Sequence, residues 1–448
     1  MEFYILFCLN YNKIMEVYIM DNKLLNGMLD FMDKSPVNFF AVKTMEEILI
    51  KNNFEELDLS KDFNLKENSK FYIKNNDSAI IAFSIGKIKR GIFKIIGSHT
   101  DSPGFKVKSN PLIKTENMLS LNTEVYGGPI LNTWLDRPLS MAGRVILKSD
   151  DPLNPKIQLI NFEKNLCIIP NLAIHMNRDI NKGFELNPQI HTLPLVALDN
   201  SKKYEKKDFI KEVISKKLEI KTEEILDYEL YLYDRQKASI LGLNDEFISS
   251  GRIDNLASAY LSLKSLVENK NHTEINVIIA TDNEEVGSGT KMGADSSFIE
   301  TSLERIVSGL KMNREDYLKN LENSFMISSD MAHGIHPNFK EKTDPTNIPL
   351  LGGGPVIKYA ANKSYASDSI SGAIFKDLCA RAKVPVQTFY NRSDLRGGTT
   401  IGPITSRRIN VRTVDVGCPM FAMHSVRELM AIKDLEYMFK VFKEFFSL

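Results

Sequence analysis

Histidine and carboxylate side chains recur where apolar runs of this 448-residue sequence end. His99 and Asp101 follow the run IIGS, and Asp330 follows FMISS. Glu284 and Glu285 stand side by side in TDNEEVGS. Such side chains are ligands for divalent cations, and their mixture suits zinc, with cobalt or manganese as other candidates. The pattern therefore predicts a metal centre.

Two further residues extend this ligand set. His424 lies in FAMHS near the end of the chain, and Asp254 lies in SGRIDNL at the start of an expected helix. Two ions about 3.5 to 4 Å apart would share one bridging carboxylate, and Asp254 could bridge them. His99 with either Glu285 or Asp330 would complete one site. His424 with the remaining carboxylate would complete the other.

The remaining acidic residues have supporting chemistry. Asp101, two positions after His99, is placed to accept the ring N–H that the metal does not use, which would fix the tautomer. One of the adjacent glutamates can bind metal while Glu284 stays free as a general base. A carboxylate suits that role because a metal lowers the pKa of water to about 7.

Each feature also fits a simpler role when it is taken alone. An HxD pair can occupy a surface turn, DNEE can form a solvated loop, and Asp254 can cap a helix. His333 and His336 in MAHGIHPN can be loop residues, and His424 can lie in a core. Their joint occurrence at several predicted strand ends favours a site.

Alternating strands and helices must position these residues. Helical spacing in KLLNGMLDFMDKS and TMEEILIKNNFEEL predicts two helices, FYIKNNDSAIIAFSIGK predicts a hairpin, and GIFKIIGSH predicts a strand buried on both faces. After Phe247 helices and strands alternate, and the last helix is expected from Ser425 onward. This order predicts an α/β fold with a mostly parallel central sheet flanked by helices. Ligands bind at the carboxyl ends of such strands.

The middle of the chain has another texture. Pieces such as LSLNTEVYGG, MAGRVILKS and KIQLINF predict strands, and SKKYEKKDFIKEVISKKLEIKTEEIL predicts a solvated helical face. The length exceeds the roughly 250 to 300 residues of one hydrophobic core. We therefore expect a catalytic α/β domain from residues 1–102 and 247–448, interrupted by a β-rich domain over residues 103–246 that acts as a lid or in oligomerisation.

Composition limits the partners and the compartment. Lys plus Arg and Asp plus Glu both number 57, so no net charge draws the chain to nucleic acid or to a membrane. Four cysteines without a CxxC pair argue against disulfides and thiolate zinc sites and favour the cytoplasm. The apolar start has Glu2 and polar interruptions, so we expect neither a signal peptide nor a membrane span. A later translation start, at Met15 or Met20, is an open alternative.

The motifs together resemble one family over nearly the whole chain, the aspartyl aminopeptidase family of co-catalytic zinc metallopeptidases. They are GSHTDSP, GRIDNL, DNEEVGS, SSDMAHGIHPN, GGGPVIK, YASD and FAMHSVRE, in the family's order and spacing. The resemblance implies a zinc-exopeptidase-like fold and hydrolysis of N-terminal residues from short peptides. It implies two zinc ions per subunit, Asp254 as the bridge and Glu284 as the base. The implied terminal ligands are His99, Glu285, Asp330 and His424.

The resemblance also implies roles that spacing does not reveal. His175 in AIHMNRDINKG would reach the active site of a neighbouring subunit and stabilise the oxyanion of the tetrahedral intermediate, although a metal-ligand role is the alternative. The subunits would form a homo-oligomer, a tetrahedral dodecamer. His333, Lys358 and Tyr365 would line the substrate pocket, where the Lys358 charge favours an acidic first residue. Asp368 departs from the asparagine of many relatives and would offset this charge, which leaves neutral or basic residues open.

Two other functions are weighed against an aminopeptidase. A related two-zinc amidohydrolase, such as a deacylase or carboxypeptidase, would use the same metal centre but would bind a substrate with a free carboxylate rather than a free amine. A non-catalytic assembly that binds peptides would use the metals as structural elements. The glycine run GGGP lacks the GK[ST] ending of a phosphate-binding loop, so it predicts a tight turn.

Overall fold

The computed structural model describes residues 23–200, 208–270 and 272–448. The expectations for the apolar start of the chain lie outside these residues, and so does the beginning of the charged segment after residue 200. None of the helices in the described part of the chain combines the length and apolar character that a bilayer crossing requires.

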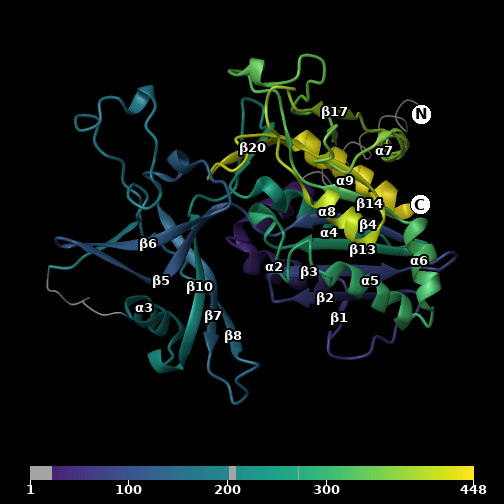
Figure 1. Ribbon diagram of the computed structural model, residues 1–448, viewed down its shortest axis with the longest axis horizontal. Coiled ribbons are helices and arrows are strands. Elements are labelled where there is room, and N and C mark those ends of the chain that lie inside the picture. Colours follow the sequence, from purple (N-terminus) through teal and green to yellow (C-terminus); the bar gives the residue numbers. More distant parts are fainter. Residues whose placement is uncertain (1–22, 201–207, 271) are drawn as a thin grey trace, which may run out of the picture.

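A mixed sheet forms the larger part of the molecule, on the right in Figure 1. Among the described residues its strand order is β1-β2-β3-β13-β4-β14-β18-β16-β17. The strands are β1 Glu55–Glu56, β2 Ser69–Asn75, β3 Ala79–Ile85, β4 Phe93–His99, β13 Ile275–Thr281, β14 Phe325–Ser329, β16 Val356–Tyr359, β17 Gln387–Tyr390 and β18 Arg412–Gly417. The central strands β13, β4, β14 and β18 are parallel. Every residue of β4 and β13 is buried, as expected for strands covered on both faces.

Helices cover both faces of this sheet. Residues 23–34 are helical, and the other helices are α2 Asn38–Lys51, α4 Ile253–Glu268, α5 Phe298–Gly309, α6 Arg314–Glu322, α7 Ser369–Arg381, α8 Ile401–Ile409 and α9 Ile432–Ser447. Ile96 of β4 packs in a core with α2, α4, α7 and α9. Its neighbour Ile95 packs in a second core with α5, α6 and α8. The alternating side chains of one strand therefore join two helix layers, and the predicted α/β class is confirmed.

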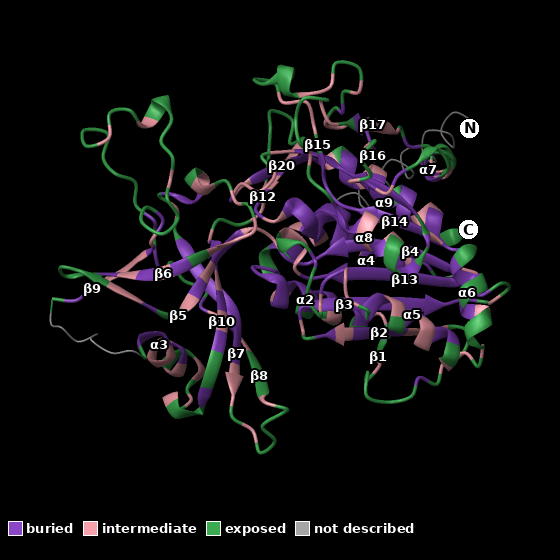
Figure 2. Ribbon diagram, viewed as in Figure 1, coloured by how far each residue is buried: buried purple, intermediate pink, exposed green. Residues whose placement is uncertain are grey.

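A second sheet lies on the left in Figure 1 and follows the order β8-β7-β10-β5-β6-β9. Its strands are β5 Gly104–Thr115, β6 Met118–Tyr126, β7 Leu139–Leu147, β8 Lys156–Asn161, β9 Leu195–Leu198 and β10 Ile225–Asp234. The helix α3 Phe209–Leu218 buries Ile210 and Ile214 against it, so one face of the charged helix packs. Figure 2 shows that the loops around this sheet are largely exposed.

A third, small sheet changes one expectation near the chain end. It contains β11 Ser239–Leu241, β12 Phe247–Ser250, β15 Ala332–His333, β19 Pro419–Phe421 and β20 Glu428–Ala431. The prediction of a helix from Ser425 onward is wrong, because β20 precedes α9 and the helix begins at Ile432. Pairing of β20 with both β12 and β19 outweighs the local preference for helix.

The remaining short elements are the 3-10 turns η1 Leu131–Trp134, η2 Ile180–Lys182, η3 Thr222–Glu224, η4 Glu284–Val286 and η5 Lys340–Lys342.

Candidate metal centre

Neighbouring parallel strands bring the candidate ligands to one edge of the large sheet. β4 ends at His99, which pairs in register with the last residue of β13. The turn η4, which carries Glu284 and Glu285, follows β13 after two residues, and Asp330 follows β14 directly. Because β13, β4 and β14 are adjacent and parallel, their carboxyl ends meet at one place.

Asp254 lies at the centre of the cluster, in the first turn of α4. Its Oδ1 is 3.4 Å from His99 Nε2, and its Oδ2 is 3.4 Å from His424 Nε2. Asp330 Oδ1 lies 3.8 Å from His99 Nε2, and Glu285 Oε2 lies 3.4 Å from His424 Nε2. The sequence leaves open which carboxylate joins which histidine at each expected metal site. These distances favour Asp330 with His99 and Glu285 with His424.

The polar atoms of this cluster fit a bound cation. Within the described residues, Asp254 Oδ1 and Glu285 Oε1 are buried and accept no hydrogen bond from the protein. Buried oxygens without a partner are rare in native proteins, and where they occur they can be satisfied by a bound ion. His99, Asp254 and Glu285 each present one ligand atom within 4.8 Å of the others. Imidazole nitrogens and carboxylate oxygens together suit zinc.

Crowding of acidic groups shifts their proton affinities. Burial, and then the charge of Asp254, raise the pKa of Glu285 well above its usual range. Burial raises the pKa of Glu284 to about 8. Burial opposes the ionisation of Asp254, but the nearby imidazole rings of His424 and His99 lower its pKa. Burial and mutual repulsion thus oppose the ionisation of both glutamates, and a bound divalent cation would favour their ionised forms.

Asp101 connects His99 to the glutamate turn. The ring Nδ1 of His99 lies 3.0 Å from the main-chain oxygen of Asp101 and 3.4 Å from its Oδ1. The same carboxylate accepts hydrogen bonds from the main-chain N–H groups of Glu284, at 3.2 Å, and Glu285, at 3.1 Å. Tyr126 Oη also donates to it, at 2.7 Å. Asp101 therefore orients the histidine through its main-chain oxygen and both glutamates through its carboxylate, so the ring hydrogen bond expected at the carboxylate is made to the main chain instead.

Sequence reasoning missed several supporting residues. Tyr126 ends β6 of the second sheet and accepts a hydrogen bond from Asn283 Nδ2 at 2.9 Å. Asn38 donates through Nδ2 to both carboxylate oxygens of Asp282, at 3.1 and 3.0 Å. Tyr126 and Asn283 are 157 positions apart in the chain, and Asn38 and Asp282 are 244 apart. No local sequence pattern could identify these hydrogen bonds.

A pocket of about 300 Å³ opens beside the cluster. Its lining includes Glu284, His333, Lys358 and Tyr365. Lys358 is only 3% exposed, and its Nζ donates to the Met331 carbonyl at 3.0 Å. The ammonium lies 3.5 Å from Asp330 Oδ2 and 5.3 Å from the centre of the Tyr365 ring. Burial opposes its charge, but Asp330 raises the pKa of Lys358, so the pocket contains a cation at neutral pH.

Asp368 does not belong to this pocket. Its side chain is exposed and caps α7, where Oδ1 accepts the main-chain N–H of Ser371 at 2.7 Å. Asp368 is absent from the pocket lining. The expectation that Asp368 offsets the Lys358 charge is therefore wrong, since the position serves the helix.

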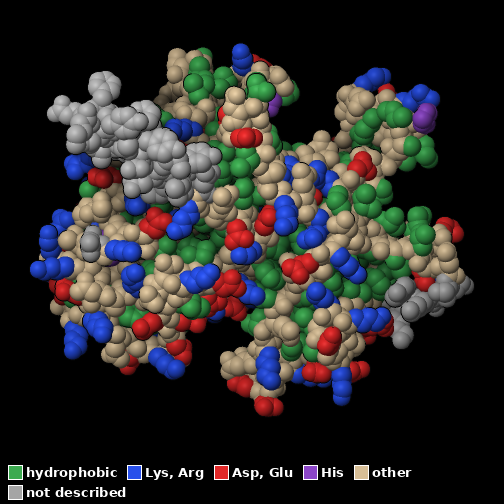
Figure 3. All heavy atoms as spheres, turned by 180° about the vertical axis from the view of Figure 1, so that it is seen from behind, with side chains coloured by type: hydrophobic (Ala, Val, Ile, Leu, Met, Phe, Trp, Pro, Cys, Tyr) green, Lys and Arg blue, Asp and Glu red, His purple; other side chains and the backbone are tan. Residues whose placement is uncertain are grey.

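His175 is also not brought to the cluster of its own chain. It is exposed, in a loop that links β8 and β9 of the second sheet. Its neighbours Leu172, Ile174 and Met176 are 55%, 47% and 74% exposed. Figure 3 shows the projecting lobe at the upper right with hydrophobic side chains in the open.

Comparisons with known proteins agree with this fold. A family model described as Aminopeptidase I zinc metalloprotease (M18) matches residues 31–446. A probable M18 family aminopeptidase 2 from Clostridium novyi is 52% identical over 429 residues, covering 95% of this chain and 99% of that protein. A structure of the Ape4 and Nbr1 complex contains a chain that is 33% identical, with a TM-score of 0.91 and coverage of 96% and 86%. The mApe1 dodecamer of S. cerevisiae is 25% identical, with a TM-score of 0.82 and coverage of 95% and 97%.

The chain belongs to the M18 family of zinc metalloproteases. It is an aminopeptidase, a hydrolase of N-terminal peptide bonds, and the resemblance found in its motifs is confirmed. The deacylase, the carboxypeptidase and the non-catalytic assembly are set aside by this membership.

Proposed function

We propose that the chain binds two zinc ions and removes N-terminal residues, preferably acidic ones, from short peptides. One observation carries the proposal: the two carboxylate oxygens of Asp254 face two different histidines, each at 3.4 Å. A single shared carboxylate between two ligand sets is the arrangement that paired metal ions use.

The ligands divide around Asp254. His99 and Asp330 would hold one ion, and His424 and Glu285 would hold the other. Bound zinc would supply a Lewis acid that polarises the scissile carbonyl and lowers the pKa of the attacking water to about 7. Cobalt or manganese could take its place, since their preferred ligands overlap with those of zinc.

Glu284 is the proposed general base. Its carboxylate lines the pocket, and its main-chain N–H is fixed by Asp101 at 3.2 Å. In the metal-free cluster burial raises the pKa of Glu284 to about 8, which makes its carboxylate a stronger base than an exposed glutamate. Glu284 would take a proton from the attacking water at its carboxylate oxygen and deliver it to the leaving amine.

The Glu284→Gln variant tests this function. It keeps the shape of the side chain but removes the basic oxygen, so we expect turnover of aminoacyl p-nitroanilides to fall by about 100-fold or more. Zinc content by plasma mass spectrometry and the mass of the oligomer should stay at wild-type values, because Glu284 is not one of the proposed ligands. Full turnover in this variant would refute the mechanism.

Lys358 supports the proposed acidic preference. Its buried ammonium at the pocket wall would attract a carboxylate side chain strongly, because the surroundings screen charge poorly. Since Asp368 lies outside the pocket, it does not oppose this preference.

The active enzyme is proposed to be a homo-oligomer, a tetrahedral dodecamer, in the cytoplasm. The exposed apolar loop around His175 supports contact with a second copy, in which His175 would stabilise the oxyanion. The structure of the S. cerevisiae relative is a dodecamer. Within the described residues Cys167, Cys379 and Cys418 are free and buried, which suits a reducing compartment. The inserted domain at residues 103–246 would serve this assembly.

A further inference from the structure

The backbone around two proposed ligands adopts unfavourable conformations. Arg252, two residues before Asp254, has a φ of 63°, and His424 itself has a φ of 67°. Left-handed backbone of this kind is disfavoured for residues with a side chain, so surrounding contacts must hold it. The two segments are also far apart in the chain, which means that no local structure fixes their distance.

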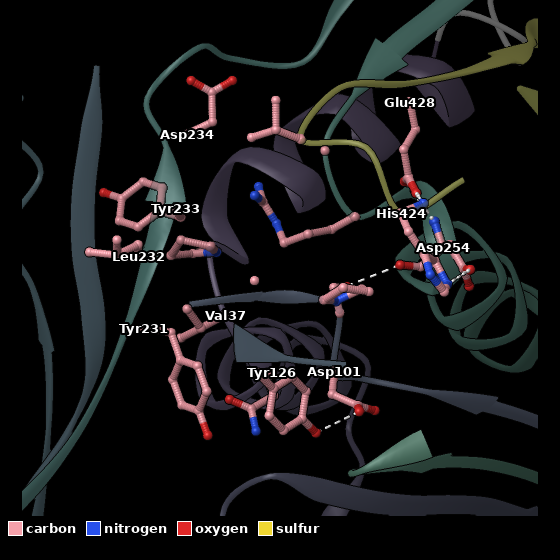
Figure 4. A pocket seen from close by; sticks show the side chains of 18 of the residues that line it. Val37, Asp101, Tyr126, Tyr231, Leu232, Tyr233, Asp234, Asp254, His424 and Glu428 are labelled. Carbon is pink, nitrogen blue, oxygen red and sulfur yellow. Dashed lines mark hydrogen bonds and ion pairs between the residues drawn. The ribbon is translucent and has the colours of Figure 1, made fainter. Parts of the chain in front are cut away.

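Glu428 contacts both segments. Its Oε1 accepts the main-chain N–H of His424 at 2.7 Å, and its Oε2 accepts the main-chain N–H of Asp254 at 3.1 Å. The residue is 2% exposed. Figure 4 shows Glu428 reaching down to His424, with Asp254 on a separate ribbon beside them. Both oxygens of a buried carboxylate thus serve two ligand residues.

The element that carries Glu428 is fixed on both sides. β20 pairs with β12 through the register Ser250 to Glu428, and with β19 on its other edge. Ser250 leads through Gly251 directly into the turn that contains Arg252. The carboxylate therefore has a defined position relative to both segments that it contacts.

We propose that Glu428 is a positioning residue of the metal centre, a carboxylate clasp that sets the distance between Asp254 and His424. The inference rests on the proposed function, because that function makes these two residues ligands. Only a carboxylate offers an acceptor to each N–H. Glutamine would turn its NH₂ group toward one of the two N–H groups and would lose that hydrogen bond.

Glu428→Gln should therefore weaken zinc binding. Partners that orient metal ligands typically contribute about 10- to 100-fold in metal affinity, and we expect a loss in that range. The measurement is zinc affinity of the full-length protein by competition with a chromophoric chelator. Excess zinc should restore part of kcat in the variant, because the clasp acts on occupancy rather than on the reacting atoms.

Glu274 provides a matched control. It is also 2% exposed and accepts main-chain N–H groups, those of Arg90, Gly91 and Ile92, but it lies at the opposite end of β13 from the cluster. Glu274→Gln should reduce stability and leave zinc affinity unchanged. Equal zinc affinity in wild type and Glu428→Gln would overturn the proposal, and so would an equal loss in both variants.

Two further variants complete the test. If Glu428→Gln does not fold, Glu428→Asp keeps the carboxyl group but is one methylene too short to reach both N–H groups, and it should show the same weakening. Wild-type zinc affinity in Glu428→Asp would then overturn the clasp. His99→Ala separates the two proposals: if this variant binds zinc like the wild type, the proposed metal centre itself fails and the clasp fails with it.

Discussion

At the scale of single residues, charge and burial at the pocket determine what the enzyme can select. Lys358 is buried, its Nζ donates to the Met331 carbonyl, and it lies beside Asp330. These contacts hold the ammonium at the wall of the pocket. An incoming carboxylate would therefore meet a fixed cation rather than a mobile surface lysine.

Lys358→Met removes this charge with little change in volume. We expect the ratio of kcat/KM for an aspartyl over a leucyl p-nitroanilide to fall by about tenfold or more, because a poorly screened ion pair is lost. Steady-state kinetics with both substrates measures the ratio. The exposed Lys363→Met is the control and should not alter it. An unchanged ratio in Lys358→Met would exclude the lysine as the determinant.

At the scale of elements, two aspartates at helix starts have different roles. Asp368 is exposed and caps α7 through the Ser371 N–H. Asp434 lies in the first turn of α9, is fully buried, and accepts the main-chain N–H groups of Gly352 and Gly354. Asp368 stabilises the start of α7, whereas Asp434 holds the turn that contains Gly352 and Gly354 against α9.

Asp368→Ala should cost about 1 kcal/mol of stability, the usual contribution of a side-chain cap. Substrate preference should stay at the wild-type ratio, because the residue is outside the pocket. Denaturant unfolding and the two-substrate assay check the two parts. A gain in acidic preference would contradict the placement of Asp368 on the helix.

Asp434 predicts a pH dependence of stability. Burial raises its pKa from 3.8 to about 7, against the opposing hydrogen bonds from Gly352 and Gly354. The folded state therefore binds a proton that the unfolded state has lost between these values, and this stabilisation is complete below pH 3.8 and lost as the pH rises to about 7.

Asp434→Asn cannot titrate and supplies the reference. From pH 4 to 8, the free energy of unfolding of metal-free wild type should fall relative to the variant by roughly 1 to 4 kcal/mol, since one pKa unit corresponds to about 1.4 kcal/mol. Urea unfolding of both proteins over this range is the measurement. If the difference in free energy of unfolding between the two proteins does not vary with pH, Asp434 is ionised in the folded state from pH 4 to 8.

At the scale of the whole molecule, the position of His175 determines whether one chain is sufficient for activity. The residue lies on an exposed apolar loop and does not line the pocket of its own chain. If it acts in a neighbouring subunit, a single subunit is incomplete as an enzyme.

Mixing two inactive variants tests this directly. His175→Ala and Glu284→Gln should each be inactive as pure assemblies. Co-assembled in equal amounts, they should regain activity, because about one quarter of the sites would combine an intact Glu284 with a neighbour's intact His175. Mass measurement by light scattering establishes that the mixed assemblies form. If mixed assemblies form without regained activity, His175 does not act across subunits.

The sequence predicts those features whose cause is local. The buried strand before His99, the hairpin between β2 and β3, and the strand-end placement of Asp330 all follow from short patterns. Features that depend on distant pairing could not be predicted. β20 is a strand only because β12 and β19 lie on either side, and Glu428 acquires its two N–H donors only in the folded chain. The expectation for Asp368 fails because a family pattern gives a position but not the direction of a side chain.

The most direct measurement is the anomalous scattering of zinc-loaded crystals at the zinc edge. The proposed function predicts two peaks about 3.5 to 4 Å apart on either side of the Asp254 carboxylate, one beside His99 and one beside His424. A single peak, or peaks away from these side chains, would contradict it.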